Sequence, residues 1–304
     1  MSDVLTSIRF LDRGRGDFYR FIPWFCTALR ESGARPIADV RLPNRLRAAC
    51  GRLFGWSLGG EREKLIVCGC HRIEAVAWPW CYRYEIVPMM WDLWPDNYAD
   101  FKRFLRRNRV RTVLCTASQS VDWINKNCPG VRAVWIPEAA DVQSFPKGPK
   151  LVGRSIDVLS YGRFPDSVRA ALDELGQQGL RCQKGAGDTF DQLTETLRSA
   201  KVSICYPLCD TNPQKAQGVE TLTQRYWEAM CSGTLIVGRA PHELVEVCGY
   251  NPVIEPSGSL SACLRTICAS VGDYQELVDR NRACAENCGD WRQRMGIVKE
   301  AVRE

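Results

Sequence analysis

The chain has 304 residues, a length that fits two domains of about 150 residues each better than one small core. Its composition, 45% hydrophobic and 25% charged, is that of an ordinary globular protein and excludes a disordered or fibrous one. Asp3 and Arg9 interrupt the N-terminal stretch where a signal peptide needs an apolar core, and no window reaches about 18 consecutive apolar residues. We therefore expect a protein that is neither exported nor membrane-spanning.

The sixteen cysteines occur mostly inside apolar segments such as LIVCGC, TVLCTA and VSICYP. A disulfide framework is typical of short secreted chains, which this chain is not. We interpret the cysteines as reduced, mostly buried thiols of a cytoplasmic protein.

Apolar runs alternate with helical periodicity along the first half, which indicates a parallel α/β sheet covered on both faces. A helix is expected at 18–32, and strands are expected at 7–12, 36–40, 64–70, 84–90 and 111–117. These elements make one Rossmann-like half.

The segment 141–155 has two prolines and two glycines and interrupts the pattern. The alternation then resumes, with helices expected at 167–176, 190–200 and from Leu222, and strands at 155–163, 180–187, 202–207, 234–238 and 251–256. After Ser257 the chain is expected to be helical. Two α/β domains in tandem form a cleft, and ligands of such domains bind at the carboxyl ends of the strands.

The segment Phe101 to Arg111 holds six basic residues and no acidic one. A basic helix with Phe101, Phe104 and Leu105 beside its cations suits anionic lipid headgroups or an acidic substrate. The alternative is a solvated helix face.

Glu220 and Glu228 lie at either end of a helix-like segment. Thr221 and Gln224 fit a capping box, which predicts a helix start at Leu222. Eight residues of helix span about 12 Å, too far for the carboxylate pair of a glycosidase. Carboxylates also accept hydrogen bonds from sugar diols, and a helix N-terminus favours phosphate, so the segment suits a sugar nucleotide.

Four segments resemble GT-B glycosyltransferases in order and spacing. ETLTQRYWEAMCSGTLIVG resembles their E-x7-E segment, VWIPEAADVQSFPKG their interdomain linker, DVLSYGRF the first strand of their C-terminal domain, and LRCQKGAGD the next strand. The resemblance covers roughly Trp135 to Pro256. The final helices, with Trp291 and Arg292, are similar to the tail that crosses back to the N-terminal domain in this family.

The resemblance implies an α/β fold of two Rossmann-like domains facing a central cleft. Residues 1–145 would form the acceptor domain and residues 146–285 the nucleotide-sugar donor domain. Residues 286–304 would be a C-terminal helix that packs back on the N-terminal domain.

The resemblance also implies a donor site. Glu228 would bind the ribose hydroxyls, Glu220 would lie near the donor sugar, and Arg163 would meet the diphosphate. The other donor-site residues that it implies are Gly162, Gly185, Thr223, Gln224 and Arg225.

The chain departs from the family pattern in two places. Val168 stands where many members have a lysine, so that Arg169 or Arg225 is a candidate to take its place. TLTQRYW replaces the usual Gly-Phe-Gly between the glutamates, which indicates a divergent branch.

An inverting transferase needs a base for the acceptor proton. Asp92 and Asp17 each follow a predicted strand of the first half, and His71 ends another, so these three are the candidate catalytic residues. Each also has a purely structural interpretation, as a helix cap, a surface ion-pair partner or a hydrogen-bonded histidine.

Cys68, Cys70 and His71 lie together, but no second ligand pair at zinc-site spacing accompanies them. We therefore expect no metal, in keeping with the many GT-B enzymes that rely on helix dipoles and basic side chains.

The expected protein is a cytoplasmic glycosyltransferase that moves a sugar from a nucleoside diphosphate sugar to a glycan, a lipid-linked or another acceptor. It would contact the inner membrane face through Phe101 to Arg111 and need no obligate protein partner. The alternatives are a sugar epimerase of the same architecture, a glycosyltransferase or binding protein directed at nucleic acid, and a non-catalytic nucleotide-binding module.

Overall fold

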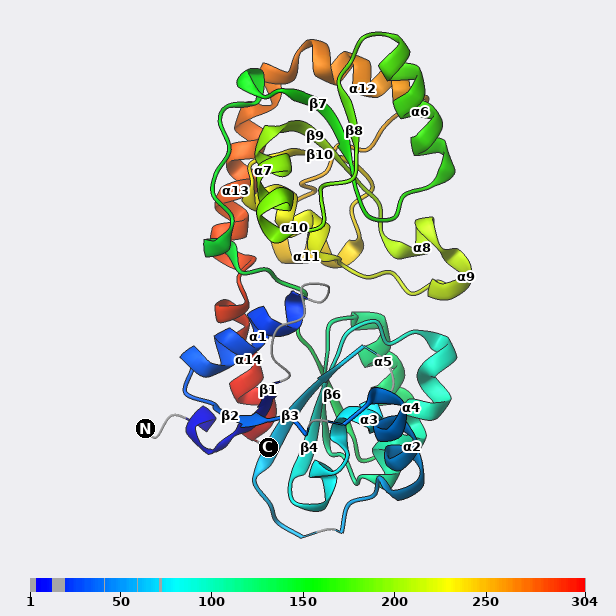
Figure 1. Cartoon of the computed structure of the whole chain (residues 1–304), viewed down its shortest axis with the longest axis vertical. Helices are drawn as coiled ribbons and strands as arrows, with labels where there is room; N and C mark the ends of the chain where they lie inside the picture. The colour runs from blue at the N-terminus through cyan, green and yellow to red at the C-terminus, as the bar shows by residue number, and fades with distance from the viewer. Residues whose placement is uncertain (1–3, 13–19, 41, 59, 71–72, 304) are drawn as a thin grey trace. The chain divides into compact units, whose positions relative to one another are not determined.

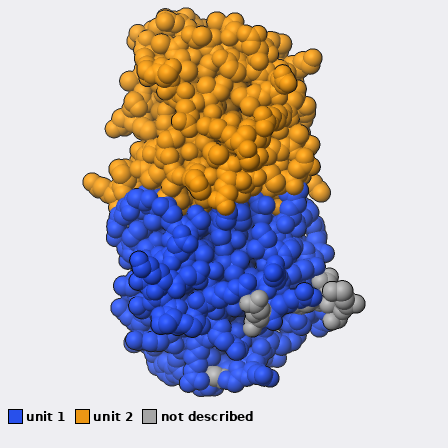
Figure 2. All heavy atoms as spheres, turned by 180° about the vertical axis from the view of Figure 1, so that it is seen from behind, with its two compact units in different colours: residues 1–137, 215–219, 291–304 blue, residues 138–214, 220–290 orange. Residues whose placement is uncertain are grey.

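The computed structural model describes residues 4–12, 20–40, 42–58, 60–70 and 73–303, which form two compact units (Figure 2). Unit 1 consists of Met1–Pro137, Lys215–Val219 and Trp291–Glu304, and unit 2 consists of Glu138–Gln214 and Glu220–Asp290.

Unit 1 is built on a parallel sheet of six strands in the order β2-β1-β3-β4-β5-β6 (Figure 1). The strands are β1 (Arg9–Asp12), β2 (Arg35–Ala38), β3 (Lys64–Gly69), β4 (Glu85–Met90), β5 (Thr112–Cys115) and β6 (Arg132–Trp135). β3, β4 and β5 are almost entirely buried, because helices cover both faces of the sheet.

The α-helices of unit 1 flank this sheet. They are α1 (Phe21–Glu31), α2 (Asn44–Phe54), α3 (Ile73–Ala77), α4 (Pro95–Arg107), α5 (Ser118–Asn127) and α14 (Trp291–Arg303). Figure 1 shows α1 and α14 on one side of the sheet and α2 to α5 on the other.

The C-terminal helix α14 belongs to unit 1, as the predicted fold requires. The Trp291 ring meets Phe25 at 5.2 Å between centroids and Trp91 at 5.8 Å. Arg292 pairs with Glu31 of α1 at 2.7 Å between Nε and Oε2. Aromatic burial therefore joins the end of the chain to the first sheet.

Unit 2 has a parallel sheet of four strands in the order β10-β9-β7-β8. The strands are β7 (Ile156–Ser160), β8 (Cys182–Lys184), β9 (Ala200–Cys205) and β10 (Leu235–Gly238). The helices are α6 (Asp166–Gln177), α7 (Phe190–Ser199), α8 (Leu208–Thr211), α9 (Pro213–Ala216, whose end lies in unit 1), α10 (Gln224–Cys231), α11 (His242–Cys248), α12 (Leu260–Ala269) and α13 (Gln275–Cys288). The prediction of two α/β domains with parallel sheets is thereby confirmed.

Short 3-10 helices complete the described secondary structure. They lie at Val4–Ser7, Trp80–Tyr82, Val142–Ser144, Leu151–Gly153 and Val271–Tyr274.

The start of unit 2 at Glu138 differs from the expected boundary at residue 146. Trp227 donates from Nε1 to the Glu138 carbonyl at 2.7 Å, and the Val142 amide donates to Asp290 Oδ2 at 3.0 Å. These contacts hold the linker segment on unit 2, where Phe145 is also buried.

Two local predictions are wrong. The expected strand at 251–256 is reduced to a bridge between Ile254 and Val237. The helix expected from Leu222 begins at Gln224, because the Leu222 amide donates to Glu243 Oε2 at 2.8 Å and the chain before α10 is extended.

No disulfide joins any of the sixteen cysteines in the structure. Seven of them are buried and the other nine are half-buried. No helix in the described part of the chain combines the length and apolarity that crossing a bilayer demands.

Candidate active site

The predicted donor-site residues gather at one edge of the unit 2 sheet. Because β7, β8, β9 and β10 are parallel, their carboxyl ends meet at the same edge. Gly162 and Arg163 follow β7, and Gly185 follows β8. Hydrogen bonds from Tyr161 and Arg225 bring α10, which carries Glu228, to the ends of β7 and β9.

Glu228 is a buried carboxylate in the middle of α10, with 5% of its surface exposed. Tyr161, the residue directly after β7, donates its hydroxyl to Glu228 Oε2 at 2.8 Å. Burial, together with the neighbouring carboxylate, raises the pKa of Tyr161 well above its ordinary value. The phenol therefore stays protonated and orients the carboxylate.

Arg225 joins two strand ends to the start of α10. Its guanidinium donates to the carbonyls of Tyr161 at 3.2 Å, Arg163 at 2.6 Å and Tyr206, after β9, at 3.0 Å. Three of the five N–H groups of an arginine are thereby engaged with backbone. Arg225 acts in this structure as a positioning residue.

Arg163 is exposed in the loop after β7, and its side chain forms no hydrogen bond or ion pair with any described residue. Gly162 before it has φ +71, and a side chain there would meet Arg225 Cδ at 3.2 Å. Arg169 lies further along, in α6, 5.9 Å from the Phe164 ring centroid. Arg163 is thus the better-placed cation for an anionic ligand.

The loop after β8 contains a glycine in an open environment. Gly185 has φ +91, and no atom lies within 4 Å of where its Cβ would be. Its amide is bonded to the Ser160 carbonyl at 2.7 Å, which ties the loop to the end of β7. Thr189 and Gln192 then form a capping box at the start of α7.

Glu220 lies outside α10, in the extended segment before it. One of its oxygens pairs with Arg239, after β10, and the other accepts from the His242 amide at 2.7 Å, at the N-terminus of α11. Arg239 also pairs with Asp210 at 2.6 Å, and this contact is the main cause of its raised pKa. Glu220 is not helical, so the rise per residue of a helix does not set its distance from Glu228. The expected separation of about 12 Å, which assumed eight residues of helix, was therefore wrongly based.

Thr223 and Gln224 begin α10 without capping it. Thr223 Oγ1 and Gln224 Nε2 are both buried, and neither has a hydrogen-bond partner in the structure. Both orphaned groups lie at the start of the helix that carries Glu228.

The sequence did not reveal three residues that shape this site. They are Tyr161, Arg239 and Glu243. Tyr161 and Arg239 directly follow the strands at 156–160 and 235–238, so their position after a strand was the one available signal. Glu243 is buried and holds the Leu222 amide, a contact that only the folded chain creates.

In unit 1 the candidate base Asp92 follows β4, and its backbone has φ +50. Few residues other than glycine adopt this conformation, and those that do are often found at functional sites. Asp17 and His71, the other candidates, lie outside the described residues. The strands that precede the three candidates, β1, β3 and β4, are adjacent in the sheet.

The described residues contain no cluster of three or more histidine, cysteine or acidic side chains suited to a metal ion. Cys68 is buried in β3 and Cys70 is half-buried after it.

The basic segment differs in one respect from its expected form. Phe101, Phe104 and Leu105 are buried against the rest of unit 1, so they are core residues. Only the cations of the segment face outward, among them Lys102, Arg106 and Arg109. Insertion of these apolar side chains into a membrane is therefore excluded.

Solved structures share this fold. Sucrose-phosphate synthase from Thermosynechococcus elongatus superposes with a TM-score of 0.64 at 12% identity, covering 97% of this chain and 98% of that chain. HepE from Anabaena, in complex with UDP and glucose, superposes with a TM-score of 0.62 at 13% identity, covering 97% of this chain and 99% of that chain. AviGT4, a glycosyltransferase involved in avilamycin A biosynthesis, superposes with a TM-score of 0.57 at 11% identity, covering 97% of this chain and 96% of that chain.

By sequence alone, no protein-family model and no curated protein matches the chain. The similarity is therefore one of fold. It extends over nearly the whole length of this chain and of each solved protein named above. The chain has the GT-B fold of these proteins.

The hydrogen bond between Tyr161 and Glu228 is expected to stabilise unit 2. Tyr161→Phe removes the donor to a charged group and should lower the free energy of unfolding by about 1.5–3 kcal/mol. Urea denaturation of this variant, of Glu228→Ala and of the double variant measures the coupling between the two residues. Strictly additive losses would contradict the bond, and Tyr274→Phe serves as the control.

Proposed function

We propose that the protein is a glycosyltransferase that moves a sugar from a nucleoside diphosphate sugar to an acceptor. The observation that carries the proposal is Glu228, a buried carboxylate beside the ends of parallel strands in a GT-B fold. Tyr161 offsets the cost of burying this carboxylate, and carboxylate oxygens at a ligand-binding edge suit the hydroxyl donors of a ribose.

In this proposal unit 2 holds the donor. Glu228, oriented by Tyr161, accepts hydrogen bonds from the two ribose hydroxyls. Arg163 pairs with the diphosphate, whose developing charge it stabilises as the sugar departs. Glu220 and the orphaned polar groups of Thr223 and Gln224 are close to Glu228 in sequence, and in this proposal they contact the sugar and its phosphates.

Unit 1 holds the acceptor and supplies the base. The bond between the anomeric carbon and the diphosphate oxygen breaks, and an acceptor hydroxyl oxygen bonds to that carbon. Asp92 takes the hydroxyl proton, with Asp17 and His71 as the other candidates. The nucleoside diphosphate leaves with the electron pair.

The acceptor class, glycan or lipid-linked, and a cytoplasmic location with peripheral membrane contact remain predictions. Uridine nucleotides are the first donors to test, because HepE was solved with UDP and with UDP-glucose. Release of nucleoside diphosphate only when an acceptor is present would distinguish transfer from epimerisation.

A thermal-shift screen of nucleoside diphosphates and their sugars tests donor binding. At about 100 times its dissociation constant the donor should stabilise the protein by roughly 2.7 kcal/mol. Glu228→Ala should abolish the shift, whereas Glu246→Ala, an acid on the exposed face of α11, should keep it. If no nucleotide moves the wild-type midpoint at such concentrations, the proposal is wrong.

Asp92→Asn and Asp17→Asn identify the base. The variant that lacks the base should lose activity by a factor of about 100 to 10,000 while its donor-induced thermal shift is unchanged. Measuring transfer and thermal shift on the same preparations separates catalysis from folding. Full activity in both variants would remove both aspartates as candidates.

A further inference from the structure

Exposed apolar side chains gather in one short segment of unit 1. The described chain exposes eight large hydrophobic side chains, and only two of them, Val152 and Ile297, lie elsewhere. The other six are Leu42, Leu46, Leu53, Phe54, Trp56 and Leu58. We call residues 42–58 the α2 patch. Clustered apolar exposure of this kind marks an interaction surface.

The α2 patch is held outward by the packing of α2 on α3. Ala48 and Gly51 form its inner face, and a Cβ on Gly51 would lie 2.3 Å from the Glu74 carbonyl oxygen. Arg47 is buried and pairs with Asp39 at 2.6 Å. The helix therefore has a fixed inner side, and Leu53 and its neighbours remain on the surface.

Aromatic rings continue the α2 patch beyond the helix. Trp56 lies 6.3 Å from both the Phe54 and the Tyr82 ring centroids. Tyr82 donates its hydroxyl to the Phe54 carbonyl. Tryptophan and tyrosine with one apolar and one polar end are typical of the boundary between a bilayer and water.

The exposed charges within the α2 patch are positive, and the acidic residues Asp39 and Glu61 flank it, Asp39 in an ion pair with the buried Arg47. From Val40 to Gly60 the sequence has four arginines and no acidic residue. Arg45 and Arg52 are exposed between the leucines. An apolar surface with interspersed arginines is complementary to anionic headgroups and the acyl boundary beneath them.

The basic segment, which comprises the second half of α4 and the residues up to Arg111, adjoins the α2 patch. Arg107 donates to the Arg52 carbonyl at 2.6 Å, and the Ser57 amide donates to the Arg107 carbonyl at 3.2 Å. Beyond these contacts Lys102, Arg106 and Arg109 are exposed, and no ion pair to any described residue involves them. Arg107 therefore joins the basic segment to the end of α2.

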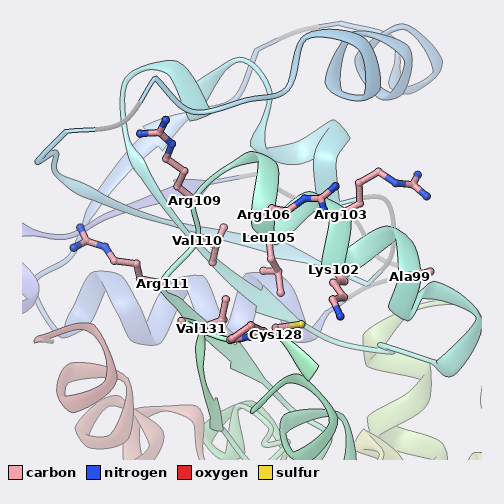
Figure 3. A pocket seen from close by; sticks show the side chains of 12 residues that line it. Ala99, Lys102, Arg103, Leu105, Arg106, Arg109, Val110, Arg111, Cys128 and Val131 are labelled. Atoms are coloured by element: carbon pink, nitrogen blue, oxygen red, sulfur yellow. The ribbon is translucent and has the colours of Figure 1, made fainter. Parts of the chain in front are cut away.

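A hollow of about 540 Å³ opens within this basic segment. Leu105, Val110 and Val131 lie at its centre in Figure 3, with the cationic side chains around them. Arg103 and Arg111 also line it, but they pair with Asp100 and Glu85. An apolar centre within a cationic rim suits the phosphate and first methylenes of a lipid.

We propose that the α2 patch and the adjoining basic segment dock unit 1 on an anionic lipid membrane. The apolar side chains of the α2 patch enter the headgroup region, and the free cations of the basic segment bind lipid phosphates. The proposal goes beyond sugar transfer and does not depend on it. In this proposal the apolar contact with the membrane is made by the exposed side chains of the α2 patch, and not by Phe101, Phe104 and Leu105, which are buried.

Sedimentation of the full chain with vesicles tests the proposal. The protein should bind vesicles of phosphatidylcholine mixed with phosphatidylglycerol, bind phosphatidylcholine alone much more weakly, and lose affinity as salt rises. Leu53→Ser with Leu58→Ser should weaken binding by about tenfold or more. Arg106→Gln with Arg109→Gln should weaken it by about fivefold or more.

Matched controls lie in unit 2. Val152 has 66% of its surface exposed, like Leu53 at 66% and Leu58 at 67%, so Val152→Ser should leave binding unchanged. Arg265→Gln with Arg280→Gln removes two exposed cations and should have little effect. The thermal unfolding midpoint of each variant, measured without ligand, shows whether it is folded, independently of vesicles and of any donor.

Three results would overturn the proposal. The first is no binding to anionic vesicles, and the second is binding that the Leu53 and Leu58 substitutions leave unchanged. The third is self-association or capture of a protein partner that these substitutions abolish while vesicle binding persists, which would assign the surface to a protein interface. None of these results would bear on sugar transfer.

Discussion

The attachment of α10 to the end of β7 is the interaction on which the candidate donor site depends. Tyr161 binds the Glu228 carboxylate, and Arg225 donates to carbonyls after both β7 and β9. Together these bonds fix the helix that carries Glu228 against the edge where the parallel strands end. Gly162 permits this approach, because a side chain there would press on Arg225. The exposed Arg163 is held in the same loop by its carbonyl.

Most strands of both sheets were predictable, because buried parallel strands are continuous apolar runs. β6 was missed, because Arg132–Trp135 is short and only Ala133 of its four residues is buried. α2 was not predicted, since its sequence, NRLRAACGRLF, has Arg47 where an inward-facing stripe would be apolar and leucines on its exposed side. The start of α10 was misplaced because the capping-box rule considers only neighbours along the chain. Glu243, distant in sequence, takes the Leu222 amide instead.

Only those site residues that belong to a recognisable sequence motif were predicted. Glu228 and Arg163 were found through a family resemblance, and the parallel topology explains why they lie at one edge. Tyr161, Arg239 and Glu243 were missed because their roles arise from contacts between elements far apart in sequence. The basic segment was identified correctly as a charge run, but its phenylalanines turned out to be core, since periodicity alone does not show which side of a helix packs.

Binding of the donor ribose by Glu228 can be tested in a crystal structure of the protein with a bound uridine diphosphate sugar. We expect the ribose hydroxyls on the Glu228 carboxylate, with Tyr161 still bound to it, and the diphosphate beside Arg163. A nucleotide bound elsewhere, or one bound at this edge with its ribose away from Glu228, would contradict this expectation.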